Sequence, residues 1–174
     1  MTGTQSSALK VSRRVLQWLI ALNIVWGLLI LALLGASFAA REKVMGALGM
    51  PATPANAPII LGMQLVAIVG VLGVPVTHIA LTRLLAIVKT VGTGDPFIAE
   101  NARRMQQIAW AVLGLELLRL GVGIIAASAS FKTAGVHIGW KFSPTPWLAV
   151  LLLFVLAQVF DNGSRMREDL DGTV

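Results

Sequence analysis

The chain has 174 residues, of which 56% are hydrophobic and 13% charged, and its formal net charge is +6. Soluble domains carry about 25% charged residues, so this composition is that of a membrane protein. The absence of cysteine excludes disulfides, thiolate nucleophiles and iron–sulfur clusters, and two histidines leave little room for other metal or haem chemistry.

Four apolar stretches are long enough to span a bilayer, since a span needs about 20 residues. Lipid offers the backbone no hydrogen-bond partner, so each stretch is predicted to be a helix, and the fold to be an all-α four-helix bundle. The whole chain, residues 1–174, is predicted to form a single transmembrane domain. The predicted spans are residues 15–38, 59–80, 108–127 and 147–166.

The first stretch follows a polar segment, residues 1–9, which we expect to be disordered. Basic residues precede the stretch and Ser37-Phe38-Ala39 resembles a signal-peptide cleavage site. However, signal-peptide cores have about 7 to 15 apolar residues, and this one is longer. An uncleaved membrane anchor is therefore the preferred interpretation.

The second stretch contains Pro75, which cannot donate a backbone hydrogen bond, so we expect a kink there. The loop before it, residues 41–58, is expected to be short and semi-rigid because it contains three prolines. Beyond Ala80, apolar residues alternate with charges at helical spacing, which predicts that the helix extends past the bilayer. Asp95 then resembles an N-cap with Pro96 at the first helical position, so a charged surface helix should lead directly into the third span.

The loop before the fourth span alternates apolar and polar residues over 136–142. This period of two predicts a short β-strand or hairpin on the extracytoplasmic face. The fourth helix is expected to continue to about Leu170. Nine Lys and Arg residues lie in the N-terminus, the middle loop and the C-terminal tail, against four in the other two loops, so both termini are predicted to be cytoplasmic.

Glu116 and Arg119 interrupt the third span. Two charges near a helix centre cost about 5 to 7 kcal/mol on the insertion scale, so the helix needs neighbours and the charges need pairing. Three residues apart, they share a helix face. Glu116 lies about 12 Å from the inner boundary, and Asn23 of the first span lies at a similar depth. The three residues form either a ligand- or ion-binding polar centre or a structural pair that fixes helix packing.

The secondary candidates are His78, Gln64 and Gln158. His78 lies near the inner end of the second span with Gln158 at similar depth, while Gln64 is nearer the outer face. The sequence has no nucleotide-binding glycine loop, no paired carboxylates and no metal-ligand spacing. We therefore expect no enzymatic activity, no cofactor, no metal and no direct binding of nucleic acid.

Two segments, GDPFIAENARRMQQIAW at 94–110 and LAQVFDNGSRMREDLDGTV at 156–174, together with four spans in this order, resemble the bacterial integral-membrane family known as domain of unknown function 2975. The resemblance covers essentially the whole chain and implies a small inner-membrane protein of unassigned activity. Members are often encoded beside a Cro-like helix-turn-helix regulator, which implies signalling or regulation. The most specific residues are Pro96, Phe97, Glu100, Asn101, Gly163, Arg167, Glu168, Asp169, Thr173 and Val174.

These features favour a sensor, regulatory or self-protection component of the bacterial inner membrane that acts with a cytoplasmic regulator. The alternative is a small transporter or channel component that uses the Glu116–Arg119 centre. Besides the lipid bilayer, the expected partner is the helix-turn-helix regulator, and a homo-oligomer stays open. The motif expected to face the regulator consists of Asp95, Pro96, Phe97, Glu100, Asn101, Arg103 and Arg104.

Overall fold

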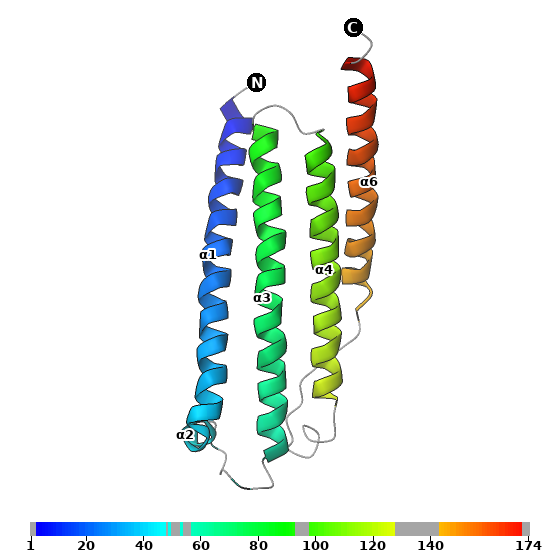
Figure 1. The fold of residues 1–174 in the computed structure, drawn as a ribbon. Coiled ribbons are helices and arrows are strands. Elements are labelled where there is room, and N and C mark those ends of the chain that lie inside the picture. Colours follow the sequence, from blue (N-terminus) through cyan, green and yellow to red (C-terminus); the bar gives the residue numbers. More distant parts are fainter. Residues whose placement is uncertain are drawn as a thin grey trace. The chain divides into compact units, whose positions relative to one another are not determined.

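The structure is a computed structural model that describes residues 3–47, 49, 53, 57–92, 98–127 and 143–171. Throughout this part of the chain the regular secondary structure is helical, which confirms the all-α prediction (Figure 1). The strand predicted for residues 136–142 lies outside the described residues. The helices are α1 (Gly3–Ala39), α2 (Arg41–Ala47), α3 (Ala57–Gly92), α4 (Ala99–Ala126) and α6 (Thr145–Asp171).

Four helices, α1, α3, α4 and α6, are long and apolar enough to cross a membrane, and each matches one of the predicted spans, although α4 ends one residue before the end of the third. They also extend beyond those spans. As predicted, α3 continues beyond Ala80, to Gly92, a helix runs unbroken into the third span, and α6 reaches Asp171. The predicted start of that helix at Pro96 is wrong, because Ile98 is not helical and α4 begins at Ala99, with the Ile98 carbonyl accepting the bonds from the N–H groups of Asn101 and Ala102. Helix α3 also passes through Pro75 without interruption. These are the helices of a multi-pass membrane protein.

One further expectation about the segments outside the spans is wrong, and another segment holds a helix that the sequence does not predict. Helix α1 begins at Gly3, although disorder is expected for residues 1–9 from their polarity. The reason is that the packing face of α1 reaches its first turns: Leu9 is half-buried, and a Cβ added to Gly92 of α3 would lie 4.0 Å from its Cδ1. The loop at 41–58 contains the short helix α2, whose first turn carries Glu42, a favourable charge at a helix N-terminus.

The chain divides into two compact units. The first comprises Met1–Asn23, Val76–Leu115 and Ser143–Val174, and the second comprises Ile24–Pro75 and Glu116–Phe142. Helices α1, α3 and α4 each contribute a part to both units, whereas α6 belongs to the first.

The core of the first unit joins α3, α4 and α6. Its buried members are Ile87 of α3, Met105 and Ile108 of α4, and Ala157 of α6. Beside this core, the rings of Trp110 and Phe154 meet edge to face, with centroids 5.2 Å apart and planes at 83°. Such aromatic pairs contribute about 0.5 to 1.5 kcal/mol beyond the area they bury, so they help to fix α6 against α4.

In the second unit α1 packs closely against α3. A Cβ on Gly27 would lie 2.7 Å from Cγ1 of Val74, so only glycine permits this approach. Further along the same two helices, Gln64 Nε2 of α3 donates a 3.2 Å hydrogen bond to Ser37 Oγ of α1. A small residue and a polar bond between helices are the usual means of association in lipid, where apolar burial supplies little driving force.

Candidate functional site

Asn101, from the motif at the start of α4, is fully buried, with 0% of its surface exposed. Its Nδ2 donates a 2.8 Å hydrogen bond to Oγ1 of Thr90, in the last turn of α3. Its Oδ1 accepts a 3.0 Å bond from Nη1 of Arg104. The Thr90 hydroxyl has one proton, and its shortest acceptor is the carbonyl oxygen of Ile87, 2.8 Å from Thr90 Oγ1. Arg104, Asn101, Thr90 and the Ile87 carbonyl therefore form one chain in which each group donates to the next.

The network continues to the surface through Arg104. Arg104 Nε lies 3.4 Å from Oε1 of Glu100, an ion pair rather than a well-aligned hydrogen bond. Arg103 makes a longer contact of 3.8 Å with the same carboxylate, and its side chain is 74% exposed. Glu100, Asn101 and Arg104 therefore form one assembly that ties the start of α4 to the end of α3. Asp95, Pro96 and Phe97 of the predicted motif lie outside the described residues.

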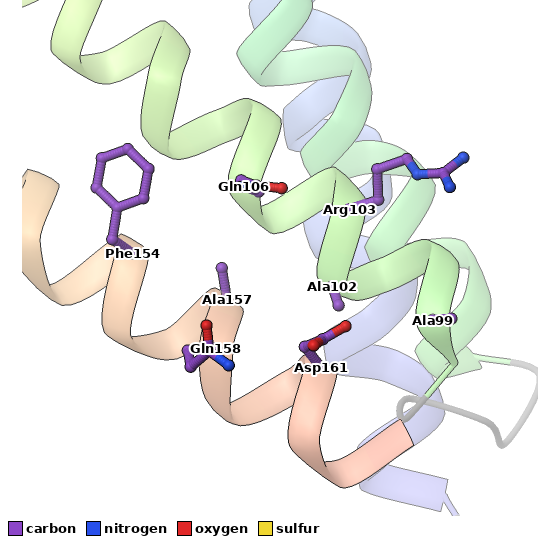
Figure 2. A pocket seen from close by; sticks show the side chains of 8 residues that line it. All are labelled: Ala99, Ala102, Arg103, Gln106, Phe154, Ala157, Gln158 and Asp161. Atoms are coloured by element: carbon purple, nitrogen blue, oxygen red, sulfur yellow. The ribbon is translucent and has the colours of Figure 1, made fainter. Parts of the chain in front are cut away.

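A cleft of about 410 Å³ lies between α4 and α6 in the first unit (Figure 2). Each helix contributes four residues with the same spacing, i, i+3, i+4 and i+7, which is one face of a helix. The cleft is hollow because three of these residues are alanine and leave the space between the backbones unfilled. From α4 they are Ala99, Ala102, Arg103 and Gln106, and from α6 they are Phe154, Ala157, Gln158 and Asp161.

The side chains give the cleft a mixed character. In Figure 2 Ala157 and Asp161 point toward α4, whereas Arg103 extends along α4 away from α6. Asp161 is held by a 2.9 Å ion pair with Arg165, one turn further along α6. Gln158 is exposed, and its Nε2 donates a 3.3 Å bond to Asn162. Phe154 and the alanines can thus accept an apolar group, while the amide of Gln158 and the carboxylate of Asp161, each bonded to a neighbour on α6, lie at the edge.

The cleft brings together the two segments on which the family resemblance rests. Its α4 wall comes from residues 94–110, and three of its four α6 residues come from residues 156–174. Among the lining residues, Arg103 and Gln158 are predicted site residues, whereas the three alanines, Gln106, Phe154 and Asp161 are not. The signal that could have found them is the i, i+3, i+4, i+7 spacing that starts at Ala99 in α4 and at Phe154 in α6.

Glu116 and Arg119 pair within α4 of the second unit, as their spacing predicts. Arg119 Nε donates to both carboxylate oxygens at 3.1 Å, and Nη2 donates to Oε1 at 3.0 Å. The Glu116 side chain is 6% exposed and that of Arg119 43%. Asn23 belongs to the first unit and the pair to the second, so a contact between Asn23 and Glu116 stays a prediction.

The three secondary candidates, Gln64, Gln158 and His78, have different hydrogen-bond surroundings. Gln64 bonds Ser37, as described above, and Gln158 lies at the cleft. His78 Nδ1 is buried and has no hydrogen-bond partner within the described part of the chain. Among the residues that the structure describes, no cluster of three or more His, Asp or Glu could hold a metal ion.

No curated protein and no solved structure matches this chain. The family model described as "Protein of unknown function (DUF2975)" matches residues 34–174, which include both segments that line the cleft. The match covers helices α2, α3, α4 and α6 and the end of α1. The chain therefore belongs to the DUF2975 family.

Proposed function

We propose that this protein is a regulatory component of the bacterial inner membrane that binds a cytoplasmic regulator at the cleft between α4 and α6. The observation that carries the proposal is that both family-specific segments, distant in sequence, face each other across this cleft. If these two segments only packed α4 against α6, the space between the helices would be filled, because protein interiors are close-packed. Here alanines leave about 410 Å³ open.

The charge distribution supports a cytoplasmic position for the cleft. The Lys and Arg excess lies in the N-terminus, the middle loop and the C-terminal tail, and positive-inside bias assigns these parts to the cytoplasm. The cleft lies beside the middle loop and the tail in sequence. The α4 residues of the cleft precede the third predicted span, whereas its α6 residues lie within the fourth, residues 147–166. A partner would therefore reach the cleft at the inner boundary of the bilayer.

The volume and side chains of the cleft indicate which side chains of the regulator could bind in it. Its volume lies within the roughly 300 to 1,000 Å³ of small-ligand pockets, which suits a few side chains rather than a whole helix. Phe154 and the alanines suit an apolar side chain. Asp161 and Gln158 suit flanking hydrogen-bond donors or a cation. A helix of the regulator that presents one apolar residue beside a basic or amide residue meets these requirements.

Site-specific photocrosslinking in native membranes tests the proposal. The photoreactive residue replaces Gln158 in the full-length protein, which is co-expressed with a helix-turn-helix regulator of the kind that the family resemblance implies. The matched control replaces Leu152, which is 68% exposed on the same helix but is not among the residues that line the cleft. We expect crosslinking of the regulator from position 158 and not from position 152. Equal yields at both positions, or none at either, would refute the proposal.

A second candidate function, a small transporter or channel component, rests on Arg119. Its side chain is 43% exposed beside the bonded carboxylate of Glu116, so the guanidinium could still bind an anion. Polar groups at membrane depth commonly mark such pathways. Flux into proteoliposomes that changes with Glu116→Gln would support this candidate, and unchanged or undetectable flux would exclude it.

A further inference from the structure

We infer that helix α1 carries a binding site for the headgroup of an anionic phospholipid, separate from the cleft and independent of the function proposed for it. The site consists of a stripe of side chains on the first half of the helix, the α1 basic stripe. Its members are Lys10, Arg13, Arg14, Gln17, Trp18 and Ala21.

The spacing of the stripe places all its members on one side of α1. All are exposed, and Trp18 is 77% exposed. The packing face of the same helix consists of Leu9, Leu16 and Ile20, which are buried or half-buried in the first unit. At 100° per residue, the centre of the stripe lies about 110° around the helix from that face. The stripe therefore points away from the core of the first unit.

Arg14, Gln17, Trp18 and Ala21 line a shallow hollow of about 260 Å³. The small side chain of Ala21 leaves this space next to the indole ring. The guanidinium of Arg14 and the amide of Gln17 both donate hydrogen bonds, and phosphate oxygens are their natural acceptors. An indole ring is amphipathic and favours the headgroup level of a bilayer, where it can cover the glycerol region of the same lipid.

The charge of the stripe is not neutralised by its own helix. Helix α1 contains no Asp or Glu, and no ion pair of Lys10, Arg13 or Arg14 occurs among the described residues. The stripe also lies where the apolar stretch of α1 begins, at Val15, which is the depth of the headgroups. Each Lys or Arg at an anionic membrane surface strengthens binding about fivefold. Arg14 at the hollow, with Lys10 and Arg13 on the same side of the helix, thus favours an anionic lipid over a zwitterionic one.

Native mass spectrometry of the full-length protein in detergent tests this site, with phosphatidylglycerol and phosphatidylcholine added in turn. We expect phosphatidylglycerol to be retained preferentially and Arg14→Gln to weaken its binding about fivefold. The matched control is Arg83→Gln, which removes an equal charge from an exposed position on α3. Arg83→Gln should leave binding unchanged. Trp18→Ala should weaken binding, while Trp18→Phe should retain most of it.

Circular dichroism of each variant checks that it is folded, and the comparison of Trp18→Ala with Trp18→Phe provides a second readout if Arg14→Gln unfolds. Equal retention of both lipids, or equal loss in Arg14→Gln and Arg83→Gln, would overturn the inference. Competition by millimolar inorganic phosphate as effective as that by phosphatidylglycerol would mean that the site binds free phosphate instead. A dimer that Arg14→Gln dissociates would show that the stripe is covered by a second copy of the chain.

Discussion

Asn101 Nδ2 donates a 2.8 Å hydrogen bond to Thr90 Oγ1, and this bond ties the first turn of α4 to the last turn of α3. The two helix ends are separated in sequence by residues 93–98. Because Arg104 also bonds to Asn101, the same contact orients a charged side chain of the motif. The family-specific asparagine thus has a structural role that supports the cleft beside it.

Replacement of Asn101 by Ala should destabilise the protein. The change removes the acceptor of Arg104 Nη1 and the donor to Thr90 Oγ1, although Arg104 keeps its ion pair with Glu100 and Thr90 its bond to the Ile87 carbonyl. Two lost hydrogen bonds cost about 1 to 3 kcal/mol in sum. Thermal unfolding in detergent micelles measures the effect. Thr90→Ser keeps the hydroxyl and should remain close to the wild type. An Asn101→Ala variant as stable as Thr90→Ser would contradict the network.

Gly27 should not tolerate even a methyl group. In Gly27→Ala the new Cβ would lie 2.7 Å from Cγ1 of Val74, and the β-branched valine has little freedom to move aside. Overpacking of this kind costs about 1 to 3 kcal/mol. Gly35→Ala, on the same helix with nothing within 4 Å, is the control and should be neutral or slightly stabilising.

Val74→Ala should rescue Gly27→Ala, because it removes the methyl groups that the new Cβ would meet. A double-mutant cycle in the same unfolding assay gives the coupling between the two positions, which should be favourable. If the two changes are simply additive, α1 and α3 do not approach each other at this point.

The sequence could predict the membrane helices but not the contacts between them. Hydrocarbon imposes length and apolarity on every span, and these are visible in the sequence without knowledge of neighbours. Asn101 reads as a surface residue near a helix start, and only the position of Thr90 on another helix explains its burial. Helix α1 begins as early as Gly3 for a similar reason. Packing of Leu9 against another helix stabilises these first turns, which the helix propensity of their own residues does not predict.

The pairing of Glu116 with Arg119 predicts an asymmetric response to mutation. Glu116→Gln leaves the Arg119 cation at membrane depth without its counter-charge, so the melting temperature should fall. In the double variant Glu116→Leu with Arg119→Leu, no charge remains to be buried. Such replacements are often neutral or stabilising by about 1 to 4 kcal/mol, so the double variant should melt at or above the wild-type temperature.

The same pair of variants separates the structural role from the transport role. If the pair only fixes packing, the double variant keeps any measured function of the protein along with its stability. A stable double variant that has lost solute flux would instead identify Glu116 and Arg119 as a working site. A double variant less stable than Glu116→Gln would show that the pair contributes more than mutual neutralisation.

Filling the cleft should abolish contact with the regulator while leaving the fold intact. Ala99 lines the cleft but is itself exposed, so Ala99→Trp adds bulk into the open space without entering the core. The melting temperature should stay within a few degrees of the wild type, because exposed substitutions usually change stability by less than about 0.5 kcal/mol. The yield of regulator crosslinked from position 158 should fall sharply.

Leu152→Trp adds an aromatic ring at an exposed position of α6 that does not line the cleft, and it should leave the yield unchanged. If Ala99→Trp crosslinks as well as Leu152→Trp, the regulator binds elsewhere on the protein.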